Sequence, residues 1–463
     1  MKFDIIIIGS GPGGYVAAIR AAQLGFKVAV VEKAELGGIC LNWGCIPTKA
    51  LLKSASVYKY LKHAKDYGIN IPDEVTIDFE NIIKRSRGVA EGMSKGIQFL
   101  FKKNNITVIN GEGCIKSDHS VEVKDIENKL SLYEAAHIII ATGSRSKELP
   151  SLRQDGKRII SYREAMTLPK QPKSMVVVGS GAIGTEFAYF YQTIGTQLTL
   201  VEFLPNILPI EDEEVSKHLE RCFKKSGMKV MTDSSVESVS IENDICKVQI
   251  KTPKGESIIE SEVVLSAVGV VANIENLGLE ENGIEIKRDK IVVDTYYKTN
   301  KEGIYAIGDV VHGPALAHVA SAEAIICVEG IAGLNPEPLD YNNIPGCTYC
   351  SPEVASVGLT EKKAIENGFE IKVGKFPFTA SGKASASGAK DGFIKVIFDA
   401  HDGKWLGAHF IGENVTEMIA GAVVARKLNA RGHDILKAVH PHPTMSEAIM
   451  EAVAAAYGEV IHL

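Results

Sequence analysis

The sequence predicts an α/β protein with two Rossmann-like dinucleotide-binding domains and a C-terminal α+β domain. Near the N-terminus an apolar strand runs into a glycine-rich turn and a helix, and the same pattern returns in the middle of the chain. From about residue 344 short strands alternate with helices, and no nucleotide motif occurs there.

Composition narrows the function classes. A chain of 463 residues is expected to form about two to four domains. The net charge of -6 gives no basic footprint for nucleic acid, and no stretch approaches the ~20 apolar residues of a membrane-spanning helix. Eight cysteines are too few for a secreted disulfide scaffold. We therefore expect a reducing compartment, with bacterial cytoplasm favoured over a mature organelle matrix.

The first nucleotide motif begins with a buried strand at residues 3–8. A glycine turn, a helix and a second strand ending at Glu32 follow it. The turn lets the backbone approach a pyrophosphate at the helix N-terminus, and Glu32 can bind a ribose. The glycines expected to contact the cofactor are Gly9, Gly11 and Gly14.

The second motif repeats the first in its glycine and acid offsets, with strands at residues 175–178 and 198–201 and the acid Glu202. Two such sites imply two cofactors and electron transfer between them. No basic residue follows Glu202 at residues 203–208, so NAD is favoured over NADP. The turn residues expected at the cofactor are Gly179, Gly181, Ile183 and Gly184.

Cys40 and Cys45 lie five positions apart in a glycine-rich stretch. Two Cα atoms must come within roughly 4.4–6.8 Å for a disulfide, whereas five residues of helix rise about 7.5 Å. The stretch must therefore bend, which its glycines permit. Pro47 suits the first position of the next helix, which puts Cys45 at a helix N-terminus that favours a thiolate. Two buried inert cysteines, or a plain staple, are the alternatives to a redox-active pair, but so short a loop makes a poor staple.

Two further turns are candidates for the first cofactor site. A strand at residues 137–140 enters a small-residue turn that contains Thr142 and Gly143. An apolar strand later ends in a Gly-Asp step at Asp309, whose carboxylate could bind a sugar-alcohol chain. Residues 149–172, which hold three prolines, are the expected hinge into the second nucleotide domain.

Near the C-terminus, His442 stands between two prolines and five residues before Glu447, with a helix following. A His–Glu pair fixes the imidazole tautomer and raises its basicity for proton transfer. On the residues alone, a surface histidine is an equal alternative. Thr444 or Ser446 is expected to cap the helix.

Together these motifs resemble the FAD-dependent pyridine nucleotide–disulfide oxidoreductases over essentially the whole chain. The resemblance implies FAD in the first site, NAD in the second, Cys45 as the flavin-proximal sulfur and Cys40 as the interchange sulfur. It also implies that Lys49 lies near the flavin and pairs with Glu186. Asp309 would bind the ribityl side of the flavin. Other family backbone contacts to the cofactors fall at Gly113, Val236, Gly269 and Ala317.

The same resemblance implies a homodimer in which His442, oriented by Glu447, serves the other subunit as acid–base. The implied activity is oxidation of a dihydrolipoyl dithiol with reduction of NAD⁺, for lipoyl domains of 2-oxo acid dehydrogenase complexes or of the glycine cleavage system. The implied domains are an FAD domain at 1–148, an NAD domain at 149–273, a segment completing the FAD site at 274–343, and an interface domain at 344–463.

The chain departs from the family pattern at Val270 and Ala272, where Arg and Pro are common, so one family contact to NAD is not expected. Pro441 replaces a commoner Ala and should stiffen the His442 loop. Cys347 and Cys350 form a CxxC, but without further ligands nearby we interpret them as packed cysteines. Two alternatives stay open: an NAD(P)H-dependent reductase of another disulfide, resembling glutathione reductase, and a flavin-binding scaffold.

Overall fold

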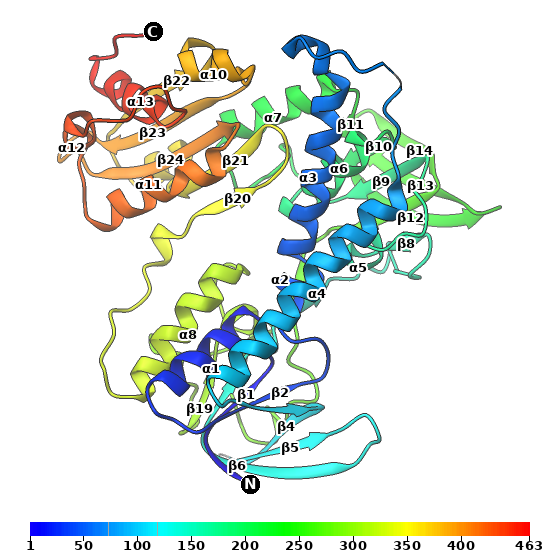
Figure 1. Cartoon of the computed structure of the whole chain (residues 1–463), viewed down its shortest axis with the longest axis vertical. Coiled ribbons are helices and arrows are strands. Elements are labelled where there is room, and N and C mark those ends of the chain that lie inside the picture. The colour runs from blue at the N-terminus through cyan, green and yellow to red at the C-terminus, as the bar shows by residue number, and fades with distance from the viewer. Residues whose placement is uncertain (73, 118) are drawn as a thin grey trace.

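The computed structural model describes residues 1–72, 74–117 and 119–463. Three bodies are arranged around the long helices of the N-terminal region (Figure 1). In the first body the strand order is β3-β2-β1-β6-β5-β4. β19 pairs with the C-terminal part of β6, on the edge of β6 that does not pair with β1. These strands are β1 (Lys2–Ile8), β2 (Val28–Glu32), β3 (Thr107–Asn110), β4 (Glu112–Ser117), β5 (Ser120–Lys124), β6 (Leu130–Ile140) and β19 (Ile304–Ala306).

The first sheet is parallel where it carries the nucleotide motif. β1 pairs in parallel with β2 and β6, and β19 joins β6 in parallel, so their carboxyl ends share one edge. The isoleucines of β1 are buried on both faces, as is usual for a parallel sheet covered by helices. On one side α1 (Pro12–Gln23) packs against α8 (Ala317–Ile331). Residues after the second domain therefore complete the first sheet.

The cysteine segment forms two helices, α2 (Gly38–Asn42) and α3 (Cys45–Lys62). Pro47 is the third residue of α3 and not the first, as the sequence had suggested, because the helix begins at Cys45. It still lies in the first turn, where a missing N–H costs no hydrogen bond. α3 packs along α4 (Phe79–Lys103), and this pair extends from the first body toward the second (Figure 1).

The second body repeats the parallel arrangement with the strand order β11-β10-β9-β15-β8. The expected hinge at residues 149–172 is more than a linker, because it supplies β8, which pairs with β15, and α5. The two bodies are also joined by β7 (Ser144–Ser146), which pairs with β16 (Val270–Ala272). The elements of the second body are β8 (Ile159–Ile160), α5 (Tyr162–Ala165), β9 (Ser174–Val178), α6 (Ala182–Thr193), β10 (Gln197–Val201), α7 (Glu213–Lys225), β11 (Lys229–Met231), β12 (Ser235–Glu242), β13 (Ile245–Thr252), β14 (Gly255–Ser261) and β15 (Val263–Ser266).

The third body is an antiparallel sheet in the order β20-β21-β24-β23-β22. α11 packs on β21 and β24, and α13 packs on β22 and β23. This is the α+β layer predicted from the alternating pattern of the sequence. Its elements are β20 (Gly346–Thr348), β21 (Glu353–Gly358), α9 (Glu361–Glu366), β22 (Ile371–Pro377), α10 (Gly382–Ser387), β23 (Phe393–Asp399), β24 (Trp405–Gly412), α11 (Val415–Lys427), α12 (Gly432–Lys437) and α13 (Glu447–Tyr457).

One hydrophobic cluster joins α3 and α4 to the second and third bodies. It includes Leu51 of α3, Phe187 of α6 and Val354 of β21. The beginning of α3 is therefore held by side chains from three separate regions of the chain. Within the described residues, no helix is both long enough and apolar enough to cross a membrane.

Candidate redox site

Cys40 and Cys45 meet at the break between α2 and α3. The backbone leaves helical geometry at Trp43 and Gly44, which have φ, ψ of -137°, 17° and -144°, -117°. A Cβ at Gly44 would lie 3.1 Å from the Ile39 carbonyl oxygen and 3.4 Å from the Cys40 Cα, so glycine allows the close approach. Cys40 and Cys45 lie close enough for each to change the acidity of the other, so the structure brings the predicted pair together.

The two sulfurs have different acidities. The hydrogen bond from the Cys40 thiol lowers the pKa of Cys45 to about 7, against the opposing effect of burial, and the Lys49 ammonium adds to the lowering. The same hydrogen bond, together with burial, raises the pKa of Cys40. Cys45 therefore ionises before Cys40, and its thiolate is the nucleophile and electron donor of the pair.

Lys49 lies one helical turn after Cys45 and joins α3 to α6. Its Nζ is 2.8 and 2.9 Å from the two carboxylate oxygens of Glu186. The Glu186 side chain is 5% exposed and that of Lys49 is 33% exposed, so the pair closes one side of the site. Tyr349 also contacts both members of the pair: its amide donates to Glu186 Oε1 at 3.0 Å, and its ring centroid lies 4.3 Å from Lys49 Nζ.

Trp43 fixes the turn between the cysteines from the other side. Its ring faces the guanidinium of Arg87 at 4.0 Å and that of Arg163 at 4.8 Å, from α4 and α5 respectively. Arg87 also donates to the Asn42 carbonyl at 2.5 Å. Such cation–π contacts hold the cysteine turn against both nucleotide-binding bodies.

The first glycine turn fits a dinucleotide. Gly9 has φ +103°, and a Cβ there would collide with the Ala141 carbonyl, while a Cβ at Gly14 would collide with the Gly9 carbonyl. A Cβ at Gly38, the first residue of α2, would lie 2.5 Å from Gly11 Cα, so α2 begins against this turn. Ser10 donates to Glu32 through its amide at 2.8 Å and its hydroxyl at 2.7 Å. The N-terminus of α1 at this turn suits a pyrophosphate, and the Glu32 carboxylate suits a ribose.

The second glycine turn has the same construction. Gly179 has φ +96°, and a Cβ there would collide with the Ala267 carbonyl. Ser180 donates to Glu202 through its amide at 2.8 Å and its hydroxyl at 2.6 Å. No heavy atom lies within 4 Å of a Cβ built at Gly181. This fits a second dinucleotide, and the held carboxylate of Glu202 would repel a 2′-phosphate.

The remaining predicted cofactor contacts lie on several elements of the first two bodies. Thr142 and Gly143 follow β6, and Asp309 follows the neighbouring strand β19, which is why Ser144 Oγ reaches Asp309 Oδ2 at 2.6 Å. Thr142 Oγ1 donates to the Asn273 carbonyl at 2.6 Å, which links this turn to the connection between the two bodies. The others lie on β4 (Gly113), at the start of α8 (Ala317), at the start of α6 (Ile183 and Gly184), on β12 (Val236) and before β16 (Gly269).

His442 and Glu447 form the expected pair. His442 Nδ1 lies 2.8 Å from Glu447 Oε1, and the Thr444 amide donates to Oε2 at 2.8 Å. Partial burial would raise the pKa of Glu447, but these two hydrogen bonds outweigh it and hold that pKa below its usual value. The expected cap is wrong: Ser446 occupies the N-cap without a side-chain hydrogen bond, and Thr444 Oγ1 donates to the Pro441 carbonyl.

The structure does not bring His442 to the cysteines of its own chain. α13 lies at the outer side of the third body, away from the start of α3 (Figure 1). The His442 side chain is 80% exposed and so is free to meet another surface.

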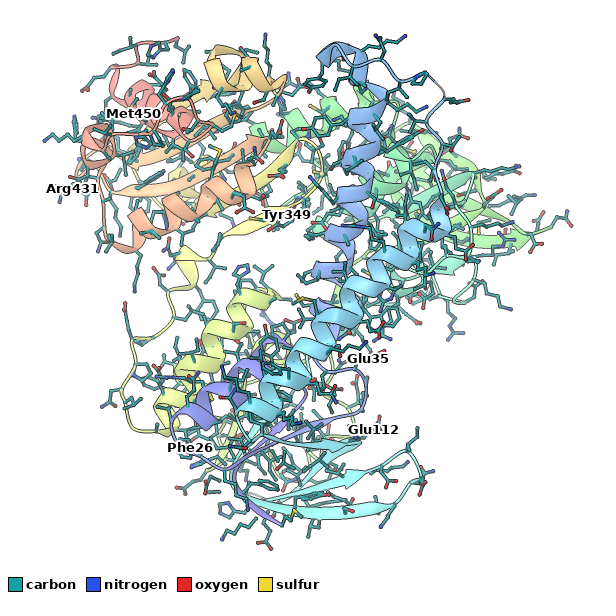
Figure 2. All side chains as sticks on the ribbon, in the orientation of Figure 1. Phe26, Glu35, Glu112, Tyr349, Arg431 and Met450 are labelled. Carbon is teal, nitrogen blue, oxygen red and sulfur yellow. The ribbon has the colours of Figure 1, made fainter. Side chains whose placement is uncertain are left out.

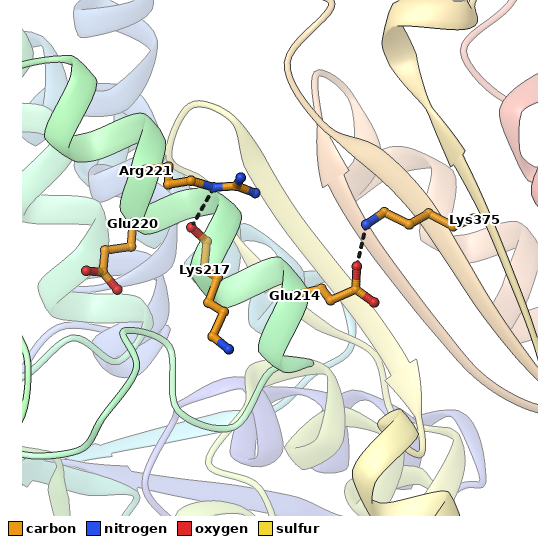
Figure 3. A pocket seen from close by; sticks show the side chains of 5 residues that line it. All are labelled: Glu214, Lys217, Glu220, Arg221 and Lys375. Carbon is orange, nitrogen blue, oxygen red and sulfur yellow. Dashed lines mark hydrogen bonds and ion pairs between the residues drawn. The ribbon is translucent and has the colours of Figure 1, made fainter.

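Two other features do not form sites. Cys350 is buried, Cys347 is half-buried, and no group of metal-ligating side chains was found among the described residues. A hollow between α7 and the third body is lined by charged side chains only, with Lys375 paired to Glu214 and Arg221 bonded to the Lys217 carbonyl (Figure 3). Its solvated charges make it unlike a cofactor pocket.

Comparisons with known proteins agree with this geometry. The model of the pyridine nucleotide-disulphide oxidoreductase family matches residues 3–324, and the dimerisation domain of that family matches residues 344–453. The chain belongs to the pyridine nucleotide-disulphide oxidoreductase family. As a member it is an oxidoreductase that uses FAD and NAD, and its dimerisation domain makes it a homodimer.

The chain is similar to enzymes with one particular name. It is 48% identical over 464 residues to the dihydrolipoyl dehydrogenase of Zymomonas mobilis, covering 99% of each chain. It is 44% identical to that of Bacillus subtilis, covering 100% of this chain and 99% of the relative. For the mitochondrial enzyme of Pisum sativum the identity is 42%, covering 99% and 92%. A crystal structure of LpdA from Mycobacterium tuberculosis superimposes with a TM-score of 0.90 at 26% identity, covering 97% and 99%.

Sequence reasoning missed three aromatic residues around the sulfurs. Tyr15 lies close enough to both cysteines for their charges to add to burial in raising its pKa. Trp43 and Tyr349 make the cation–π contacts described above. Tyr15 lies in the first nucleotide motif and Trp43 lies between the two cysteines, so their positions in the sequence could have indicated a role. Nothing in the sequence connects Tyr349 with Lys49.

Proposed function

We propose that this protein is a dihydrolipoyl dehydrogenase, which oxidises protein-bound dihydrolipoyl groups and reduces NAD⁺. The observation that carries the proposal is the difference in acidity between the two thiols. The pKa of Cys45 is lowered to about 7, and Cys45 lies at the N-terminus of α3 beside the Lys49–Glu186 pair. The pair also lies next to the first glycine turn, since α2 begins against Gly11. A dithiol substrate needs such a pair, because exchange requires one sulfur to attack and the other to leave.

In this proposal Cys40 receives the substrate sulfur and Cys45 faces the first cofactor. A substrate thiolate attacks Cys40 of the oxidised pair, which forms a mixed disulfide and releases Cys45 as a thiolate. The second substrate thiol then closes the substrate disulfide and frees Cys40 as a thiol. Lys49 stabilises this negative charge, and Glu186 holds the lysine in place. FAD at the first site and NAD at the second, when bound, supply the electron acceptor and the hydride acceptor.

His442 acts as the proton acceptor for the substrate dithiol. Its Nδ1 is engaged by Glu447, which leaves Nε2 to take the proton and stabilises the resulting imidazolium. Because His442 is exposed and remote from its own cysteines, we propose that it completes the site of the other subunit of the dimer. The chain boundaries that follow are an FAD domain at 1–148, an NAD domain at 149–273, a segment completing the FAD site at 274–343 and an interface domain at 344–463.

The partners proposed are lipoyl domains of 2-oxo acid dehydrogenase complexes or of the glycine cleavage system. The support is the printed name shared by the relatives and the dithiol chemistry of the site. The relatives are bacterial and mitochondrial. We propose the bacterial cytoplasm for this chain because identity reaches 48% with a bacterial relative and 42% with the mitochondrial enzyme of Pisum sativum.

The proposal is tested by steady-state turnover of the flavin-loaded enzyme with dihydrolipoamide and NAD⁺. The Cys45→Ser enzyme should bind flavin and lose dithiol turnover. The His442→Gln enzyme should lose about two to four orders of magnitude in dithiol turnover while still passing electrons from NADH to artificial acceptors. A clear preference of the parent for NADPH, or for a disulfide other than lipoamide, would contradict the proposal.

A further inference from the structure

Tyr349 is the third member of the Lys49–Glu186 group. It lies between β20 and β21, on the side of the third body that faces α3 (Figure 2). Its amide donates to Glu186 Oε1 at 3.0 Å, and its half-buried ring lies over the Lys49 ammonium, with the centroid 4.3 Å from Nζ. The group therefore joins α3, α6 and the third body at one point.

Lys49 needs more than one contact to stay near Cys45. Its side chain is a flexible four-carbon stem that is 33% exposed, and an ammonium with only one partner can turn toward water. Glu186 draws the ammonium toward α6, whereas an aromatic face restricts it laterally without competing for its hydrogen bonds. The ionisable groups that act on Cys45 are Cys40 from α2, Lys49 from its own helix and Glu186 from α6. Tyr15 from α1 also lies close to this sulfur.

We propose that Tyr349 is a positioning residue for the sulfur chemistry, whose ring and backbone amide hold the Lys49–Glu186 pair so that the ammonium stays beside Cys45. This inference deepens the proposed function, since it concerns the sulfur that the proposed reaction uses. In the described part of the chain no hydrogen bond joins Tyr349 to Cys40 or Cys45, so Tyr349 acts through Lys49. Through this contact the third body, which also carries His442, influences the sulfur in the first body.

The test measures the ionisation of Cys45 directly. Flavin-loaded enzyme with Cys40→Ser, which isolates the Cys45 sulfur, is titrated with pH while thiolate absorbance in the ultraviolet is recorded. The absorbance of the same protein with Cys45→Ser added is subtracted, which removes the contribution of every other titrating group. With Tyr349→Leu added, the midpoint should rise by roughly half a unit, because the ammonium is less restrained but still present. Tyr349→Phe retains the ring and should restore the midpoint.

Each outcome bears on the inference. An unchanged midpoint with Tyr349→Leu would overturn it, and so would an equal rise with Tyr349→Phe, which would assign the effect to the hydroxyl. Tyr349→Met replaces the leucine variant if that chain does not fold. Turnover of the parent enzyme with dihydrolipoamide is measured separately. Loss of the proposed function would appear as an inactive parent, whereas failure of this inference would leave the parent active and the midpoints equal.

Discussion

Replacing Lys49 by Met should weaken the Cys45 thiolate. Side chains four residues apart on a helix have Cβ atoms about 5–6 Å apart. A unit charge about 6 Å from a thiolate, at an effective dielectric constant of about 20, interacts by roughly 2.8 kcal/mol, or about two pKa units. Glu186, 2.8 Å from the ammonium, cancels part of this effect, and the exposure of Lys49 screens it further.

We therefore expect the pKa of Cys45 to rise by about one unit from its value of about 7. Because a thiolate is favoured above its pKa, the variant at pH near 7.4 should hold roughly threefold less thiolate than the parent. The assay is the ultraviolet thiolate titration in the Cys40→Ser background. This substitution removes the effect of the Cys40 thiol from every protein alike, so the difference between midpoints is compared. Lys53→Met is the matched control, because Lys53 lies one turn further along α3 and is exposed. Equal midpoints for Lys49→Met and the parent, or a rise with Lys53→Met, would refute the reasoning.

Three further predictions follow from the site. Glu447→Gln removes the charge that stabilises protonated His442, so dithiol turnover should fall at least tenfold and the acid limb of its pH–rate profile should move to lower pH, while NADH oxidation by artificial acceptors stays near the parent rate; an unchanged pH–rate profile would count against the pair. Gly44→Ala should push α3 away from Cys40, and measured thiol reactivity should then show Cys45 losing its low pKa; a parent-like profile would show that the close approach is not needed. Glu202→Arg should bring the NADP:NAD ratio of kcat/KM up by about tenfold or more, and no change in this ratio would mean that the Glu202 carboxylate does not set nucleotide choice.

The sequence was informative where chemistry requires a fixed local pattern. The glycine turns, Cys40 and Cys45 are constrained within a few residues by backbone geometry, so both nucleotide motifs and the bend were predictable. The Lys49–Glu186 pair was expected only through resemblance, since 137 positions separate its members.

What could not be predicted depends on tertiary contacts. The crossing between the two nucleotide-binding bodies is a two-stranded pair, β7 and β16, whose strands are short and distant in sequence. Tyr349 reaches Lys49 only because β20 and β21 fold toward α3, which no local pattern specifies. The predicted cap of α13 was wrong for a different reason. The Thr444 amide donates to the Glu447 carboxylate, the Thr444 hydroxyl donates to the Pro441 carbonyl, and the Ser446 side chain makes no capping hydrogen bond.

The central claim is that Cys40 and Cys45 exchange electrons between a dithiol substrate and the first cofactor. Its most direct test is the anaerobic addition of one equivalent of dihydrolipoamide to the oxidised, flavin-loaded enzyme without NAD⁺, followed by visible absorbance. The parent should show a new long-wavelength band as the Cys45 thiolate forms against the flavin, and the Cys45→Ser enzyme should show none. A parent spectrum that does not change, or an equal change in both proteins, would contradict the account.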